Sequence, residues 1–224
     1  MVLQAKDLVR RGWKDKGIKM LENYDCINLP CVECDIAERI KLLFLSNSQQ
    51  KRYEHILSVT ERIDKIAIQY GLDREKCCVA ALLHDISTLI KWEDMPCFAK
   101  DSDWSLCEAE ITSPFLLHQR ISETVAREDF GITDGDVLGA IAFHTSLCEH
   151  ASKYQMALFI ADKLECSLGG HPPYYESMIE ALDISMEKAC YEYVRYMQNE
   201  GNMQSVHSDF AKAVNWLEKI VQAY

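Results

Sequence analysis

Residues 80–87, AALLHDIS, place a histidine and an aspartate side by side at the end of an apolar run. Such a run is expected to be buried, and an uncompensated buried carboxylate costs on the order of several kcal/mol. A cation is therefore expected beside Asp85. A metal ion bound by His84 and Asp85 would meet that need.

Further side chains of the same chemistry are predicted to face the same interior. They are three histidines and one aspartate on neighbouring predicted helices: His55, His118, His144 and Asp162. His118 and His144 continue the apolar stripes of their helices, so both should point inward. Asp162 lies one turn past Leu158, on the side of its helix that should be buried, and His55 lies at the edge of its apolar face.

Taken together, the six groups indicate a metal centre. A single core histidine is more often a hydrogen-bonded packing residue than a ligand. Without metal, however, two carboxylates and four imidazoles would have to be paired among themselves. Nitrogen and oxygen ligands without thiolate suit iron, manganese or zinc better than magnesium, and two metal ions about 3.5 to 4 Å apart, bridged by one carboxylate, would use all six groups. Asp85 is the natural bridge, because its neighbour His84 would bind one of the two ions.

The elements that would hold these side chains are predicted to be helices. One apolar face recurs at steps of three and four residues, and Gly71 should end that helix; the face comprises Ile56, Val59, Ile63, Ile66 and Tyr70. Residues 74–90 read as a buried central helix and residues 91–112 as a surface loop. Ser113 and Pro114 should then open a helix that runs to about Glu128.

Capping signals and a break organise the remaining chain. Thr133 with Asp136, and Ser152 with Gln155, have the spacing of capping boxes at the starts of two helices. The Gly- and Pro-rich stretch SLGGHPPYY, residues 167–175, should interrupt the chain before two more helices over about 176–199 and 206–222. The fold class expected is therefore all-α.

Composition and charge exclude several classes of protein. The chain has 224 residues, 48% of them apolar, and a net charge of −11 from 24 basic and 35 acidic residues, which disfavours a general nucleic-acid binder. The sequence shows neither a signal-peptide pattern nor an apolar stretch near the roughly 20 residues that cross a bilayer. We therefore expect a soluble, cytoplasmic protein with no membrane partner, whose ten cysteines are reduced. The CxxC of Cys31 and Cys34 lacks an evident fourth ligand, so packing is preferred to zinc.

The order of histidine, His-Asp pair, two histidines and aspartate resembles the HD-domain superfamily of metal-dependent phosphohydrolases, in the subset with two extra histidines. More narrowly, several segments resemble the YqeK-type symmetrical dinucleoside-tetraphosphatases, which split diadenosine tetraphosphate into two ADP: RYEH (52–55), AALLHDIS (80–87), LLHQ around His118, FGITDGDVLGAIAFHTS (130–146) and FIADKLE (159–165).

The resemblance implies an HD-domain helical bundle over residues 51–224, with residues 1–50 as an N-terminal helical extension. It also implies a di-iron site, with manganese or zinc as alternative metals. One metal would be held by His55, His84, Asp85 and Asp162, and the other by Asp85, His118 and His144. The substrate expected is a nucleotide or a dinucleoside polyphosphate, and a homodimer is one assembly that we consider.

The chain departs from the family pattern around the site. The family usually has a lysine where this chain has Thr88, an arginine where it has Leu168, and a glycine where it has Leu147. Lys91, one turn after Thr88, is a candidate replacement for the lysine. With Asp85 as the catalytic bridge, the candidates for orienting phosphate are Thr88, Lys91, Thr145 and Lys163, and Lys163 is preferred because it adjoins a ligand.

Two other functions use the same six residues. HD-domain oxygenases hold a mixed-valent di-iron pair and cleave polyols or phosphonates with dioxygen. A regulator that binds a nucleotide without turnover is the other alternative, since two family cations are replaced in this chain. Metal-activated hydroxide attacking phosphorus remains the preferred mechanism.

Overall fold

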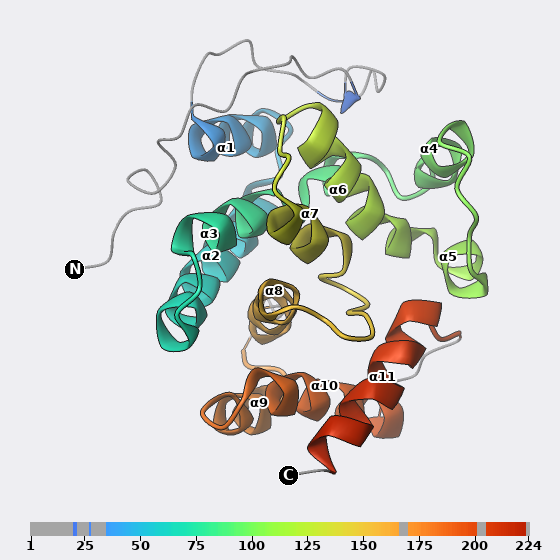
Figure 1. Ribbon diagram of the computed structural model, residues 1–224. Coiled ribbons are helices and arrows are strands. Elements are labelled where there is room, and N and C mark those ends of the chain that lie inside the picture. The colour runs from blue at the N-terminus through green and yellow to red at the C-terminus, as the bar shows by residue number, and fades with distance from the viewer. Residues whose placement is uncertain (1–19, 22–26, 28–34, 166–169, 201–204, 223–224) are drawn as a thin grey trace.

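The computed structural model describes residues 20–21, 27, 35–165, 170–200 and 205–222, and the regular structure in these ranges is entirely helical (Figure 1). The α-helices are α1 (Ile36–Ser46), α2 (Gln50–Tyr70), α3 (Arg74–Leu83), α4 (Met95–Asp101), α5 (Glu108–Thr112), α6 (His118–Glu128), α7 (Gly135–Ala142), α8 (Lys153–Leu164), α9 (Tyr175–Leu182), α10 (Met186–Glu200) and α11 (Ser208–Val221). Two short 3₁₀ turns are η3 (Ile86–Leu89) and η4 (Pro114–Leu117). The predicted all-α class is confirmed. No described helix is long and apolar enough to cross a bilayer.

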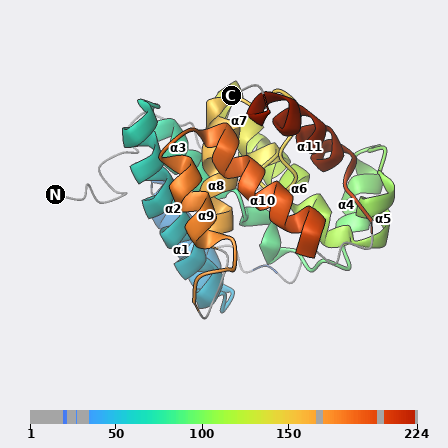
Figure 2. The same cartoon turned by 90° about the horizontal axis from the view of Figure 1, so that it is seen from below.

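Helix α8 lies at the centre of the bundle. It packs against α2, α3 and α7 on one side and against α9 and α10 on the other (Figures 1 and 2). All its residues from Met156 to Leu164 are buried, including Asp162 and Lys163. A helix hydrophobic all round is expected at such a central position, so its two charged residues must find partners inside the protein.

Helix α2 forms as its periodicity predicts. Ile56, Val59, Ile63 and Ile66 are buried along one face, and Tyr70 is the last helical residue. Gly71 follows with φ of 65°, a left-handed conformation that glycine adopts at little cost. The face that carries the isoleucines therefore aims His55 toward α8.

The predicted helix over residues 74–90 is shorter than expected. Asp73 caps α3 by accepting the backbone N–H groups of Glu75 and Lys76, and α3 ends at Leu83. His84 and Asp85 form a turn, and η3 then continues to Leu89. The continuous apolar run hid this break, because burial on all sides carries no periodic signal. The turn frees both side chains to face the interior.

The prediction of a loop over residues 91–112 is wrong. This segment contains α4 and α5, and α5 begins with a capping box between Cys107 and Glu110. Phe98 packs against Trp104 with ring centroids 5.6 Å apart. Helices of five to seven residues are too short to show a hydrophobic period, so the sequence pattern missed them.

Helix starts were predicted with mixed success. The capping box of Ser152 with Gln155 at α8 is confirmed. At α7 the cap is Asp134, which accepts the N–H groups of Asp136 and Val137, so the prediction of Thr133 is wrong by one residue. Ser113 makes no side-chain cap bond, and Pro114 begins η4, with α6 starting only at His118.

The remaining predictions concern the helix expected over residues 176–199 and the N-terminal extension. The helix predicted over residues 176–199 is two helices, α9 and α10. Most of the predicted N-terminal extension, including Cys31 and Cys34, lies outside the described residues. Its described part includes α1, which packs against α2 and α3, and the backbone N–H groups of Met20 and Leu21, which donate to Asp129. A division of the chain at residue 50 stays a prediction.

Candidate metal centre

Six side chains from separate elements converge beside α8. They are His55 in α2, His84 directly after α3, Asp85 directly before η3, His118 at the first residue of α6, His144 in the turn after α7, and Asp162 in α8. Five of them are buried, and His55 is partly exposed. The sequence placed His84 and His144 on helices, whereas both stand in turns at helix ends. All six predicted residues are nevertheless brought together.

The carboxylate of Asp85 lies between two pairs of histidines. Its Oδ2 atom is 3.8 Å from His84 Nε2 and 4.0 Å from His55 Nε2. Its Oδ1 atom is 3.6 Å from His118 Nε2 and 3.8 Å from His144 Nε2. Each oxygen therefore faces a different pair of imidazoles. This is the arrangement that a carboxylate bridging two cations would require.

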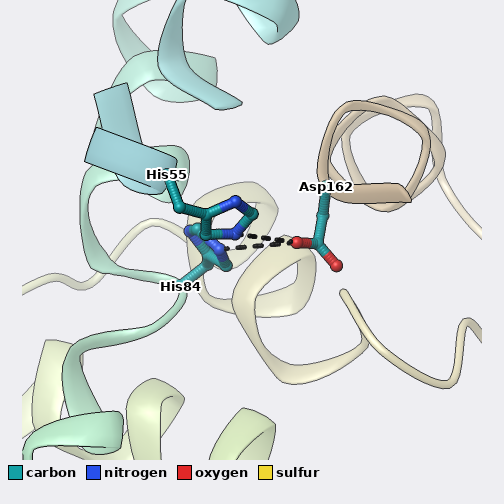
Figure 3. A group of neighbouring side chains, drawn as sticks. All are labelled: His55, His84 and Asp162. Carbon is teal, nitrogen blue, oxygen red and sulfur yellow. Dashed lines mark ion pairs between the residues drawn. The ribbon is translucent and has the colours of Figure 1, made fainter. Parts of the chain in front are cut away.

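Asp162 faces the first pair of histidines, His55 and His84. Its Oδ1 atom lies 3.2 Å from His55 Nε2 and 3.8 Å from His84 Nε2, and Figure 3 shows the two imidazoles directed toward this carboxylate. His55, His84 and Asp162 form one compact group of nitrogen and oxygen donors, and His84, Asp85 and His144 form a second, so His84 belongs to both. His118 adds a nitrogen 3.6 Å from Asp85 Oδ1.

Hydrogen bonds orient all four imidazoles in the same way. In each ring the Nδ1 atom lies near a backbone carbonyl oxygen: His55 with Glu165 at 3.2 Å, His84 with Ala81 at 2.7 Å, His118 with Phe115 at 2.6 Å and His144 with Ile141 at 2.8 Å. A carbonyl only accepts, so the Nδ1 atoms carry the protons when the rings are neutral. The Nε2 lone pairs are then left to face the interior, as in histidines that bind metal.

Three of these nitrogens are poorly satisfied by the described residues alone. His84 Nε2 is fully buried and has no hydrogen-bond partner among the residues that the structure describes. His118 Nε2 and His144 Nε2 lie 3.0 Å apart, where two bare lone pairs would repel. About 3 Å is also the separation of two adjacent ligands that each lie about 2.1 Å from one metal ion. The donor set therefore fits divalent metal.

The charges of the site favour the forms that bind metal. Burial raises the pKa of Asp85, but the surrounding imidazoles lower it by more, so its pKa lies below the usual range. Lys163 and His55 likewise outweigh burial and hold the pKa of Asp162 well below normal. Burial lowers the pKa of His118 and of His144. Burial also acts to lower the pKa of His55, but Asp162 and Asp85 outweigh it and raise that pKa. Ionised carboxylates and neutral His118 and His144 are protonation states that metal binding requires.

A cavity of about 490 Å³, here called the metal cavity, opens over these residues. Besides five of the six metal-site side chains, it is lined by Lys51, Arg52, Phe115, Thr145, Lys163 and Glu165. The Nζ atom of Lys163 donates to Asp162 at 2.7 Å, and the Thr145 hydroxyl lies 3.1 Å from His118 Nε2. Two of the four residues predicted to orient phosphate, Lys163 and Thr145, therefore line the metal cavity.

The other two predicted orienting residues lie elsewhere. The Thr88 hydroxyl donates to the backbone carbonyl of Asp85 at 2.6 Å, which holds the turn that carries the carboxylate. Lys91 is exposed and is not among the residues that line the metal cavity. Its predicted role as a replacement cation therefore gains no support from its position.

Arg52 and Phe115 are two residues at the site that the sequence pattern did not identify. Arg52 Nη1 lies 3.7 Å from Asp85 Oδ2, one helical turn before His55 on α2. Phe115 stacks on the ring of His118, with centroids 4.4 Å apart. The spacing of Arg52 from His55, one helical turn, indicates that the two share a face of α2. An arginine on the polar side of an amphipathic helix, however, is ordinarily solvated.

Leu147 has a backbone conformation that favours glycine, the residue at this position in the family that the sequence resembles. Its φ is 55°, within the left-handed region. Residues with a Cβ atom bear a cost of about 1 to 2 kcal/mol there. The Leu147 side chain is fully buried, which offsets part of that cost. The turn that follows His144 therefore keeps the glycine-like geometry without the glycine.

A second group of potential metal ligands has a different explanation. Cys107, Glu110 and His207 lie close together, but His207 Nδ1 accepts the N–H of Asp209 at 3.2 Å. The proton of a neutral ring is then on Nε2, facing Glu110, and cannot coexist with a metal bond. Burial raises the pKa of Glu110, but His207, whose Nε2 lies 3.7 Å away, and hydrogen bonds from the Cys107 N–H and Arg120 lower it to about 2. This group is an internal network that joins α5, α6 and α11.

A comparison with protein families matches residues 52–166 to the HD domain, which is half of the chain. The chain belongs to the HD-domain family. The match begins at Arg52 and extends past Asp162, so it contains all six residues of the candidate metal centre. HD domains bind divalent metals, and the chain is a hydrolase of this family.

Relatives of this HD domain include named hydrolases. It is 32% identical over 118 residues to the symmetrical bis(5'-nucleosyl)-tetraphosphatase of Halalkalibacterium halodurans, covering 52% of the chain and 62% of that enzyme. It is 30% identical over 130 residues to the enzyme of the same name from Staphylococcus aureus, covering 57% of the chain and 66% of that enzyme. An uncharacterized protein of Lactococcus lactis subsp. cremoris is 29% identical over 73% of the chain and 76% of its own length.

A solved structure shares the same fold. A crystal structure of a predicted HD superfamily hydrolase involved in NAD metabolism from Clostridium acetobutylicum superposes with a TM-score of 0.73 at 27% identity. The superposition covers 82% of this chain and 97% of that protein. The helical bundle described above is therefore an HD-domain fold over most of its length.

Proposed function

We propose that this protein is a metal-dependent phosphohydrolase that splits a dinucleoside polyphosphate, such as diadenosine tetraphosphate, into nucleoside diphosphates. The observation that carries the proposal is the position of Asp85, whose two oxygens face two separate pairs of histidines. Two metal ions fit this donor set, with iron preferred and manganese or zinc as alternatives. Relatives named as symmetrical tetraphosphatases support the choice of substrate.

When bound, the metal ions would supply positive charge and lower the pKa of water for attack on phosphorus. In the hydrolysis the oxygen of water bonds to one of the two central phosphorus atoms. The bond from that phosphorus to the oxygen that links the two central phosphates breaks, and this oxygen leaves with the electron pair and gains a proton. Asp85 and Asp162 would hold negative charge beneath the reacting phosphate, and the Nε2 atoms of the four histidines face the two oxygens of Asp85 in two pairs. The side chains thus fix the geometry before substrate arrives.

Three cations at the metal cavity suit a polyphosphate chain. Lys163, Lys51 and Arg52 line it, and Arg52 reaches within 3.7 Å of Asp85. Positive groups held in place offset the charge that develops on phosphate oxygens in the transition state. These residues would supply the positive charge that the resembled family obtains from a lysine at the position of Thr88 and an arginine at the position of Leu168. Leu168 itself lies outside the described residues. The Thr145 hydroxyl can orient a phosphate oxygen.

The activity test is direct. Purified protein, analysed for bound iron, manganese and zinc, is incubated with diadenosine tetraphosphate, and ADP is measured by chromatography. ADP as the sole nucleotide product supports symmetrical hydrolysis, whereas AMP with ATP would show a different cleavage point. Oxygen uptake with a reducible di-iron signal, and no phosphate chemistry, would favour the oxygenase. Tight nucleotide binding without any product would favour the regulator.

Metal binding should also stabilise the fold. Chelator-treated protein is expected to melt about 5 to 10 °C below protein saturated with Mn²⁺ at about one hundred times its dissociation constant. The reason is that bound metal satisfies His84 Nε2 and separates the facing His118 and His144 nitrogens. Differential scanning fluorimetry measures the shift, with Mg²⁺ at the same concentration as the control. Equal melting temperatures with and without Mn²⁺, Fe²⁺ and Zn²⁺ would contradict a metal centre.

A further inference from the structure

A second cavity of about 390 Å³ adjoins the metal cavity. We define it by Ser113, Leu116, Thr145, Tyr193, Met197 and Phe210, which line it. Thr145 lines both cavities, so the two meet at the residue whose hydroxyl lies beside His118. None of the six metal-site side chains lines the second cavity. Its role must therefore be something other than metal binding.

The same elements form walls of both cavities. In and beside η4, Phe115 lines the metal cavity, while Ser113 and Leu116 line the second cavity. On the opposite side, Lys163 of the metal cavity lies with its Nζ atom 5.7 Å from the ring centre of Tyr193, which lines the second cavity. A ligand that extends past Thr145 from one cavity would enter the other.

The linings of the two cavities differ in chemistry. Lys51, Arg52 and Lys163 line the metal cavity, whereas no lysine or arginine is among the described residues that line the second cavity. The second cavity instead offers the rings of Tyr193 and Phe210, a methionine and several hydroxyl groups. Aromatic and thioether side chains suit the faces of a nucleobase, and hydroxyls suit a ribose. A cavity of this volume falls within the range of about 300 to 1,000 Å³ that holds small ligands.

We propose that the second cavity binds one purine nucleoside of the dinucleoside polyphosphate, while the phosphate chain crosses Thr145 to reach the metal centre. This inference rests on the proposed function. A cut at the middle of the chain breaks the P–O bond between the second and third phosphates and leaves a nucleoside diphosphate on each side of that bond. The two nucleosides must then occupy two places, one beyond the cationic end of the metal cavity and one past Thr145. The second cavity would thus distinguish substrates with two nucleosides from those with one.

Two substitutions that fill the cavity from opposite sides test the inference. Met197→Trp on α10 and Ser113→Trp beside η4 both add bulk, and Ser113 is exposed and makes no side-chain cap bond, so its variant should fold. The substrates compared are diadenosine tetraphosphate and adenosine tetraphosphate, which has the same phosphate chain but one nucleoside. In both variants KM for the dinucleoside compound is expected to rise about tenfold. KM or the inhibition constant of adenosine tetraphosphate should stay unchanged.

The matched control is Gln198→Trp, which adds the same bulk to the exposed neighbour of Met197 on α10. Equal changes for both compounds, or no change for either, would overturn the second nucleoside site while leaving the proposed function intact. Wild-type protein that releases no ADP would instead refute the proposed function. Calorimetry then decides the inference separately: wild-type protein that binds both compounds with equal affinity overturns it, and tighter binding of the dinucleoside compound, lost in both filled variants, supports it.

Discussion

Replacement of Asp85 by alanine is expected to abolish metal binding at one or both positions and to lower the rate of diadenosine tetraphosphate hydrolysis by about a thousandfold or more. In the described part of the chain, Asp85 is the one carboxylate within 4.0 Å of all four Nε2 atoms of the site. Without it, each pair of histidines would hold a cation with less negative charge and no shared ligand. Metal content by plasma mass spectrometry and ADP release should therefore fall together.

Two further variants separate this effect from damage to the fold. Asp85→Asn keeps the size of the side chain and should lose activity almost as completely, because the bridging charge is gone. Asp101→Ala removes an exposed carboxylate at the end of α4 and should leave metal content and rate unchanged. If Asp85→Ala kept full metal content and full activity on every nucleotide tested, a di-metal mechanism would be wrong.

Periodicity made the inward direction of His55, His118 and His144 predictable, and the apolar run before His84 and Asp85 made their burial predictable, although neither signal revealed how the residues are presented. The isoleucine face of α2 fixed which way His55 points, and the apolar stripes of α6 and α7 did the same for His118 and His144. In the structure His84 and His144 lie just past helix ends, where each Nδ1 reaches back to the carbonyl three residues earlier. The apolar stripe of α7, continued one turn beyond the helix end, points in the same direction. His144 was therefore correctly predicted to face the interior, although it lies in a turn and not in a helix.

Other parts of the molecule lacked a readable pattern. Helix α3 is buried on every side, so nothing periodic marked its end at Leu83 before the His-Asp turn. Helices α4 and α5 have too few residues to show a period. Arg52 was overlooked because a basic residue on a helix surface ordinarily faces solvent, and only the spatial approach of Asp85 gives it a partner. Contacts between segments distant in sequence were the missing information in each case.

Replacement of Lys163 by methionine should reduce activity while leaving the metal bound. Lys163 is buried in α8, and its Nζ atom lies 2.7 Å from Asp162 Oδ2, the oxygen other than the one that faces His55 and His84. Methionine keeps the apolar volume against Phe159 and removes the charge. We expect kcat/KM for diadenosine tetraphosphate to fall about a hundredfold, as for loss of a fixed group that stabilises transition-state charge.

The separation of metal content from rate is what identifies this role for Lys163. Because Nζ contacts Asp162, a lysine that only positions the carboxylate would lower metal content when removed, as in the Asp85 variants. A lysine that acts on phosphate would instead leave metal content near that of the wild type, and Lys163→Arg would restore part of the rate. Lys153→Met, at the exposed start of the same helix, provides the matched control and should behave as wild type. Full activity in Lys163→Met would show that the remaining cations of the metal cavity are sufficient for the phosphate chain.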